Sequence, residues 1–324
     1  MAGSKILLSC VNTRVSLIGF DLEKKEPFWY CPSNILKACS ICYFQDALYV
    51  STDNILTRLD PSGATVYQLP GPHTNYAHSI KPLSSNQLGL ADTGNSCIQF
   101  FDGQNFTFRL SPLESWGTIP IDAIHVNDFL PWHDGLLVSA FSYQPFVDWK
   151  KTSFDWQRDG WGVLYYLQRF ERKTLSKIVA LNLSCPHTLT SYDGDVYCCA
   201  SATGEWIKFK AIGDELQAKS RTLVTSSHFL RGALRYQDGW ILGGSSKRHA
   251  EGLGMQLYFL PDGGTPSILW GGGEGEIYDI LPWDDDLMPA ICDYLHKAPE
   301  LPLEYEDDQA EDFPPRCSLP AEYR

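Results

Sequence analysis

The sequence lacks the features that would anchor it in a membrane or direct it out of the cell. No run approaches the roughly 18 consecutive apolar residues that a membrane-spanning helix needs. The first residues, MAGSKILLSC, contain one lysine and a short apolar stretch, without the basic region and small-residue cleavage site of a secretory signal. We therefore expect no membrane partner and a cytoplasmic location.

Positive charge and the common catalytic motifs are also scarce. Lys and Arg number 26 against 39 Asp and Glu, so the net charge is -13, and the basic residues form no stripe. Because phosphate binding needs clustered Lys and Arg, nucleic acid is not expected as a partner. The GxSxG, HExxH and Walker motifs are missing, so any active site must be found in another way.

Cysteine occurs ten times, but almost never with the spacing of a metal or redox motif. Cys39 and Cys42 form one CxxC pair, and no second pair follows that would complete a zinc ribbon. Without a secretory signal, the cysteines are expected to be free thiols that pack as small hydrophobic residues in a reducing compartment.

What the sequence does contain is an internal repeat of roughly 40 to 60 residues, the period of β-propeller blades. Each copy has short apolar strands separated by turns such as Asp193-Gly194, and few segments show helical periodicity. Aromatic residues make up 13% of the chain, which suits an all-β protein. The copies begin at or near Cys39, His78, His125, His187, His228 and Glu276.

These repeats predict an all-β, six-bladed β-propeller, with five or seven blades as alternatives. The copy after Glu276 is too short for a whole blade, and the N-terminal KILLSCVNTRVSLIGFDL has two strands without a first strand of its own. We expect the N-terminal strands to complete the last blade, because this closes the ring and leaves no exposed strand edge.

The propeller is expected to form a single domain over residues 1–296. Residues 143–170 depart from the repeat as a Trp-rich insertion in the third blade, which could act as a lid. Residues 297–324 form an acidic, proline-containing tail, expected to wrap over the surface or to be disordered.

In a propeller the first strand of each blade lines the central channel, so residues at one point of the repeat gather around it. The matched starts carry His78, His125, His187 and Glu276. Neutral imidazoles and a carboxylate bind Zn²⁺, Fe²⁺ or Mn²⁺, which makes these four residues the predicted ligands of a divalent metal. The same residues could instead act as general acid and base, and a lone strand histidine is often only a core or turn residue.

Other polar residues near the matched starts are candidates for catalytic roles. Alignment on the Asp-Gly turn places Arg231 instead of His228 at the channel, where it would bind a carboxylate or phosphate or form a structural ion pair. Asn127 could add a polar ligand, whereas the mutually equivalent Asp128 and Asp279 are expected to close turns within their blades. The catalytic candidates are Arg231, Asn127, Glu276 and His228. The histidines expected in loops or on the surface are His73, His133, His249 and His296.

Five segments carry a resemblance to a known family: HVND at His125, DWQRDGWGVL at Asp155, CPHTLTSYDG at Cys185, FLRGALRYQDGWILGGSSKRHAEG at Phe229 and EIYDILPW at Glu276. The chain resembles an uncharacterised family of bacterial propellers, some of whose members are joined to tetratricopeptide repeats. The resemblance covers most of the chain from His78 to Trp283 and implies a propeller, but no assigned reaction. It singles out His125, His187, Arg231 and Glu276. The first blade departs from the pattern, with Cys39-Ser40 where others have histidine.

More distantly, the architecture is similar to that of virginiamycin B lyase and the gluconolactonases, propellers with a metal in the central channel. The preferred interpretation is a metal-dependent enzyme of specialised metabolism, with lyase, isomerase, hydrolase or oxidase chemistry on a small polar metabolite. Trp149, Trp156 and Trp161 would cover the substrate or only pack the insertion on the propeller. The alternatives are a non-catalytic interaction scaffold and metal-free acid–base catalysis. Substrate, metal identity and oligomeric state remain open.

Overall fold

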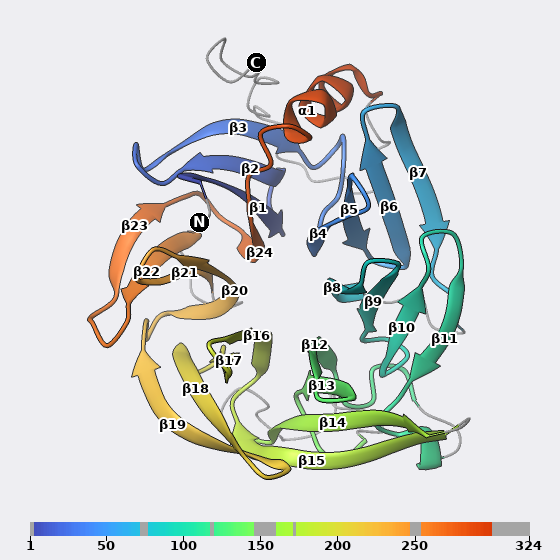
Figure 1. Cartoon of the computed structure of the whole chain (residues 1–324). Helices are drawn as coiled ribbons and strands as arrows, with labels where there is room; N and C mark the ends of the chain where they lie inside the picture. The colour runs from blue at the N-terminus through green and yellow to red at the C-terminus, as the bar shows by residue number, and fades with distance from the viewer. Residues whose placement is uncertain are drawn as a thin grey trace. The chain divides into compact units, whose positions relative to one another are not determined.

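The structure, a computed structural model, describes residues 3–71, 77–116, 120–145, 160–170, 173–246 and 254–299. In these ranges the chain forms six four-stranded sheets (Figure 1). The same ranges contain one short 3-10 helix, Glu114–Trp116, and one α-helix, α1 (Met288–Lys297).

The strands follow the chain from sheet to sheet. The sheet that contains the N-terminus consists of β24 (Glu276–Pro282), β1 (Lys5–Val11), β2 (Val15–Asp21) and β3 (Glu26–Pro32). The next two consist of β4 (Ile41–Phe44), β5 (Ala47–Thr52), β6 (Ile55–Asp60) and β7 (Gly63–Gln68), and of β8 (Ala77–Ser84), β9 (Gln87–Asp92), β10 (Cys97–Phe101) and β11 (Phe106–Leu110). The fourth consists of β12 (Val126–Trp132), β13 (Gly135–Ala140), β14 (Gly162–Phe170) and β15 (Lys173–Leu183). The last two consist of β16 (Pro186–Tyr192), β17 (Asp195–Ala200), β18 (Glu205–Ile212) and β19 (Glu215–Leu223), and of β20 (His228–Tyr236), β21 (Gly239–Ser246), β22 (Gln256–Pro261) and β23 (Ser267–Gly271).

The N-terminal strands complete the last sheet, as predicted. β24 pairs antiparallel with β1, and this places Ile6 opposite Pro282 and Val11 opposite Glu276. Six four-stranded sheets in the described ranges, with this closure, constitute a six-bladed β-propeller, and the predicted fold class is confirmed.

The second strand of a sheet is apolar along its length because both of its faces are covered. β9 and β17 are buried at every residue but the first, whereas the outermost strand β19 is mostly exposed.

The predicted turn at Asp193-Gly194 joins β16 to β17, with φ values of 52° and 77° at its two central residues. Two positive φ values define the type I′ turn that matches the twist of a hairpin.

A buried hydroxyl joins most sheets to the following one. The Ser or Thr stands at or just after the end of the second strand, except in β1, where it is Ser9. In each case it donates to a backbone carbonyl near the start of the next sheet's first strand, and the net contribution of such a bond is about 1 kcal/mol. The pairs are Ser9–Cys39, Ser51–Ala77, Thr93–Val126, Ser201–Leu230 and Ser245–Ile277, with O···O distances of 2.5, 3.0, 2.5, 2.6 and 3.0 Å.

The chain divides into two compact units, which we describe separately. The first unit contains Met1–Val50, Thr57–Tyr67 and Gly232–Arg324, and the second contains Ser51–Leu56 and Gln68–Arg231. The second unit therefore includes the complete sheets that begin with β8, β12 and β16, and its core is formed by the buried faces of these sheets.

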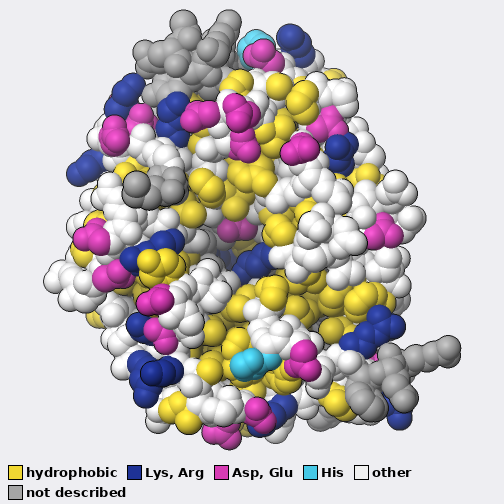
Figure 2. All heavy atoms as spheres, viewed as in Figure 1, with side chains coloured by type: hydrophobic (Ala, Val, Ile, Leu, Met, Phe, Trp, Pro, Cys, Tyr) yellow, Lys and Arg dark blue, Asp and Glu magenta, His cyan; other side chains and the backbone are white. Residues whose placement is uncertain are grey.

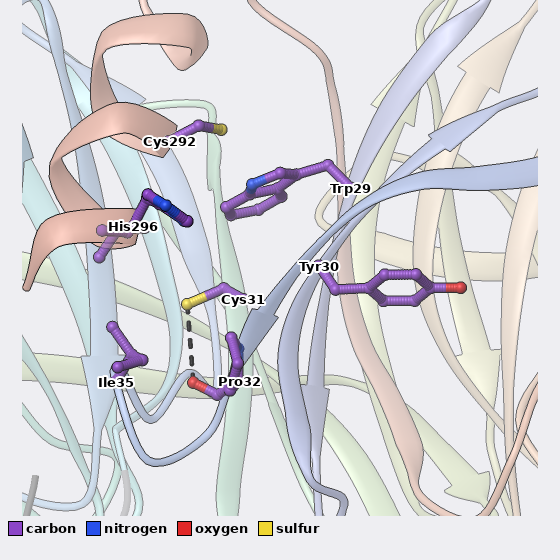
Figure 3. A pocket seen from close by; sticks show the side chains of 8 residues that line it. Trp29, Tyr30, Cys31, Pro32, Ile35, Cys292 and His296 are labelled. Atoms are coloured by element: carbon purple, nitrogen blue, oxygen red, sulfur yellow. Dashed lines mark hydrogen bonds between the residues drawn. The ribbon is translucent and has the colours of Figure 1, made fainter. Parts of the chain in front are cut away.

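Helix α1 belongs to the first unit and covers one edge of its core. Its buried residues Met288, Ile291, Cys292 and Leu295 recur at helical spacing and join the cluster around Trp29. A small pocket lies between α1 and β3, with Trp29, Cys31 and His296 on its wall (Figure 3). α1 is too short to cross a bilayer, and the described part of the chain has no longer helix.

The predicted insertion at 143–170 overlaps a regular strand, because Gly162–Phe170 is β14, which pairs with β13 and β15. Trp161 packs near Tyr143, with 5.7 Å between the ring centroids. Trp149, Trp156, His73, His249 and residues 300–324 of the predicted tail lie outside the described residues. On the face shown in Figure 2, the visible Lys and Arg side chains of the described residues are scattered among acidic ones.

Candidate functional site

Three neighbouring first strands of the second unit position the candidate site. β8 and β16 both pack against β12. Each of the three strands contains a β-bulge near its start, where the register with its neighbour shifts. The bulged residues are His78, Asn127 and Thr188. Because a bulge turns its side chain away from the regular alternation, it is a common way to aim a functional group.

The structure brings three of the predicted histidines together. The ring centroids of His78 and His125 are 4.9 Å apart, with the rings perpendicular. The ring centroids of His78 and His187 are 6.5 Å apart, with an interplanar angle of 17°. Side chains separated by more than a hundred residues in sequence thus form one imidazole cluster, which we call the histidine cluster.

The Nδ1 atoms of His78 and His125 have side-chain acceptors. Nδ1 of His78 lies 3.0 Å from Oδ1 of Asn127, and Nδ2 of Asn127 donates to the His125 carbonyl at 3.0 Å, which fixes the orientation of the amide. Nδ1 of His125 lies 2.9 Å from both carboxylate oxygens of Asp122. These acceptors assign the proton of each ring to Nδ1 and the lone pair to Nε2.

His187 is held in the same tautomer by neutral acceptors. Its Nδ1 lies 3.0 Å from the Cys185 carbonyl and 2.9 Å from Oγ of Ser201. Since the Ser201 hydroxyl donates to the Leu230 carbonyl at 2.6 Å, it accepts from His187. Ser201 is therefore held as a hydrogen-bond acceptor and is not activated as a nucleophile.

The other ring nitrogen of His187 is the most informative atom of the cluster. The residue is 3% exposed, and its Nε2 is buried with no hydrogen-bond partner. Burial holds the pKa of this imidazole well below its ordinary value of 6.5, and the positive charge of Arg231 lowers the pKa further. The ring is therefore neutral at physiological pH, with a lone pair on Nε2 that no protein group uses.

An aromatic wall covers one side of the cluster. Phe141 stacks on His125, with 4.3 Å between the ring centroids, and meets the edge of His187 at 5.1 Å. Phe141 also forms a small buried cluster with Cys185 and Phe229. This wall limits the access of water and strengthens polar interactions beside it.

Some of the described residues with a strained backbone lie at this cluster. Non-glycine residues with a left-handed φ flank or belong to the cluster: Asp122 at 52°, His125 at 53°, Cys185 at 51° and Thr188 at 48°. Each such conformation costs of order 1 kcal/mol or more, and strained residues gather at functional sites.

The remaining predicted site residues have other surroundings. His228 begins β20 and is 1% exposed, and its Nδ1 lies 2.9 Å from Oγ of Ser227. Arg231 is 8% exposed and close enough to His187 to affect its pKa. Glu276 belongs to the first unit, where it accepts a hydrogen bond from Nδ2 of Asn12 at 2.7 Å. His133 and His296 are exposed, as predicted.

Asp128 and Asp279 are structural, as predicted, but they join sheets instead of closing turns. The Asp128 carboxylate accepts from the backbone N–H of Phe129 at 2.7 Å and of Leu189 in β16 at 2.5 Å. The Asp279 carboxylate accepts from the N–H of Ile280 at 2.9 Å and from the Ser40 hydroxyl, next to β4, at 2.7 Å.

The matched repeat starts are not all equivalent in register. The bulge places His78 level with Asn127, whereas His125 stands two residues before Asn127 and directly precedes β12. Sequence reasoning missed Asp122, Phe141 and Ser201. The spacing Asp122-Ala-Ile-His125 is the one signal that could have suggested the first of them.

The donor set suits a transition metal, although the cluster is not arranged around an ion. Among the described residues, no group of three or more His, Cys, Asp or Glu side chains has metal-binding geometry. The chemistry nevertheless fits: the imidazoles of His78, His125 and His187 carry their lone pair on Nε2, and their Nδ1 atoms have the acceptors that metal-ligating histidines generally have.

The chain has no match among protein-family models or among curated proteins. It is similar to a solved protein of unknown function from Bacteroides caccae, with 12% identity, 86% of this chain and 98% of that chain covered, and a TM-score of 0.60. A chain of a nidogen/laminin complex matches with 13% identity, coverage of 86% and 97%, and a TM-score of 0.55. A luciferin-regenerating enzyme matches with 12% identity, coverage of 77% and 81%, and a TM-score of 0.51. The expected resemblance to bacterial propellers of unknown function is confirmed at the level of the fold.

Proposed function

We propose that the protein is an enzyme that acts on a small polar metabolite at the histidine cluster, with a bound divalent transition metal. His78, His125 and His187 would hold the ion through Nε2. Propeller enzymes are among the proteins with this fold, which makes an enzymatic function plausible but does not identify a reaction.

The Nε2 atom of His187 is the observation that carries this proposal. Leaving a polar atom buried and unpaired costs about 1–3 kcal/mol. A protein that keeps such an atom beside two further imidazoles, in strained backbone, gains from a ligand that accepts its lone pair. A metal ion or the N–H or O–H group of a bound molecule would do so.

When bound, the metal would act as a Lewis acid on a carbonyl or hydroxyl oxygen of the substrate. The side chains of the protein would orient the substrate, exclude water and fix the imidazole rings. Arg231 would orient an anionic group of the substrate, and Phe141 would exclude water from one side. Asn127 fixes the ring of His78, and the Ser201 hydroxyl and the Cys185 carbonyl fix that of His187.

A non-catalytic interaction scaffold is the second candidate, and the similarity to a chain of a nidogen/laminin complex favours it. A scaffold has no need for an unpaired buried imidazole or for left-handed backbone residues beside it. The two functions therefore differ in one measurable respect, the binding of ligand by Nε2 of His187.

The direct test is metal analysis of the purified protein after equilibration with Zn²⁺, Mn²⁺ or Fe²⁺. The variant His187→Gln removes one predicted ligand, and the triple variant His78→Ala, His125→Ala, His187→Ala removes three. His133→Gln is the matched control, because His133 is exposed and outside the cluster. We expect about one ion per chain in the wild type and the control, and a large loss in both cluster variants.

Retention of the ion by the triple variant would show that the metal binds outside the histidine cluster. If no ion binds to the wild type, metal-dependent chemistry is ruled out. Catalysis would then be tested by incubating the protein with fractionated polar metabolites and comparing turnover with that of His187→Gln. Turnover that survives chelation but is lost in His187→Gln would identify acid–base chemistry. Equal metabolite profiles for the wild type and His187→Gln would favour the scaffold.

A further inference from the structure

The three imidazoles of the histidine cluster differ in the group that holds Nδ1. His78 has an amide oxygen, and His187 has a backbone carbonyl and a hydroxyl. At His125 the group is a carboxylate, that of Asp122, with both oxygens 2.9 Å from Nδ1. The side chains of His125 and Asp122 are 16% and 18% exposed, so the pair is largely shielded from solvent.

The backbone around Asp122 is built to hold this pair. The Asp122 N–H donates to the Gly94 carbonyl at 2.9 Å, and the Ala123 N–H donates to Oγ of Ser96 at 3.1 Å. On the other side, the Phe141 N–H donates to the carbonyls of Ile124 and His125 at 3.0 and 3.2 Å. These bonds hold the backbone on both sides of Asp122 and His125, which have left-handed φ values of 52° and 53°.

A carboxylate that accepts from Nδ1 affects an imidazole in two ways, and a neutral acceptor has the same effects more weakly. It fixes the Nδ1–H tautomer and the ring plane, and its negative charge makes Nε2 a stronger electron donor. The same arrangement orients a histidine that takes a proton from a substrate.

We infer that Asp122 is the positioning residue of His125, and that it makes His125 the strongest donor of the three imidazoles. The inference rests on the proposed function for the identity of the ligand, but its geometric content applies to the protein without a ligand as well. The resemblance in sequence singled out His125 and not Asp122, whose role is visible only in the structure.

The first experiment measures the affinity of the full chain for Co²⁺, by its visible absorption, and for Zn²⁺ by competition. Asp122→Asn removes the charge and nearly preserves the shape. Asp102→Asn is the matched control with the same change in charge, because Asp102 is an exposed turn residue that accepts from the N–H groups of Gln104 and Asn105. We expect Asp122→Asn to weaken binding by about 10- to 100-fold, and Asp102→Asn to leave it unchanged.

The second experiment needs no metal. The protein labelled with ¹⁵N-histidine is examined in two-bond ¹H–¹⁵N spectra, with His125→Gln used to assign the His125 signals. We expect the Nδ1–H tautomer at His125 in the wild type, and a shift toward the Nε2–H tautomer in Asp122→Ala, where Nδ1 has lost its acceptor.

The two experiments separate the inference from the proposed function. If the wild type binds neither ion but shows the Nδ1–H tautomer and its loss in Asp122→Ala, the metal proposal fails and the role of Asp122 is supported. If ions bind with equal affinity to the wild type and Asp122→Asn, the inference is overturned while the metal site remains. An Nε2–H tautomer in the wild type also overturns it, and this measurement needs only His125→Gln, for the assignment of the His125 signals.

Discussion

The starts of β12 and β24 have nearly the same sequence, NDFLPW and YDILPW. The residues just before these segments nevertheless have different hydrogen-bond partners. In both, the aspartate that follows the bulge joins its strand to the next sheet. The residues before it differ: His125 is bonded to Asp122, whereas Glu276 is bonded to Asn12. In these two strands the repeat keeps the carboxylate that joins the sheets and changes the polar residues before it.

The largest expected effect comes from removing the joining carboxylate beside the cluster. Asp128 is 4% exposed, and besides two backbone N–H groups it binds Nζ of Lys81 at 2.6 Å. We expect Asp128→Ala to lower the free energy of unfolding by about 3 kcal/mol, because it leaves a half-buried ammonium without its carboxylate. Asp279→Ala should cost less, about 1–1.5 kcal/mol, because Asp279 is partly exposed and water can replace it. Urea unfolding measures both, and equal losses would contradict the difference.

The joining hydroxyls give a second contrast between the two units. Ser201 donates to the Leu230 carbonyl and accepts from His187, whereas Ser245 donates to the Ile277 carbonyl. We expect Ser201→Ala to cost about 1–3 kcal/mol, since buried groups on two sides lose a partner, and Ser245→Ala about 1 kcal/mol. Thermal unfolding of the two variants compares them, and a larger loss in Ser245→Ala would show that His187 does not depend on the Ser201 hydroxyl.

The pH dependence of stability should arise partly from His187. Its pKa is lowered in the folded protein, so below pH 6.5 the unfolded chain binds a proton there that the folded chain does not. The stability associated with neutral His187 is therefore present above pH 6.5 and is lost as the pH falls, by about 1.4 kcal/mol per pH unit. We expect the slope of unfolding free energy between roughly pH 6.5 and 5.5 to be smaller in His187→Gln by about 1 kcal/mol per pH unit, because the unfolded imidazole is only half protonated at pH 6.5. Identical slopes in the two proteins would place the low pKa of His187 in doubt.

The smallest effect is expected at the surface pair that β1 makes beside β24. Nζ of Lys5 lies 3.2 Å from Asp285, whose side chain is 74% exposed. Exposed pairs contribute little because water and salt screen them. We expect Lys5→Met to change the unfolding free energy by less than about 0.5 kcal/mol, against a substantial loss for Lys81→Met. A large effect of Lys5→Met in a urea titration would show that this pair matters more than its exposure suggests.

Much of the fold could be predicted because the repeat is visible in the strands and turns. The short final copy and the unpaired N-terminal strands were sufficient to predict the pairing of β24 with β1. Helix α1 was missed, although Met288, Ile291, Cys292 and Leu295 follow the helical period, because a single ten-residue helix has a weak signal beside many strands.

The candidate site could be predicted only in part. His78, His125 and His187 were found because the repeat aligns them, but the expected equivalence of His78 and His125 was wrong. A bulge inserts one residue without leaving a mark in the sequence. Asp122 was missed because it lies before the strand, in a segment that is not part of the repeat. The predicted roles of Arg231, His228 and Glu276 stay predictions.

The sequence alone predicted the repeated strands, the preferred count of six blades and the closure of the ring, because hydrophobic alternation and turn residues are local properties of the chain. Tertiary structure decided which side chains meet. Bulges, left-handed residues and the approach of neighbouring sheets determine where an imidazole points and which acceptor holds its Nδ1. Those depend on the packing of strands far apart in the chain, which local patterns do not record.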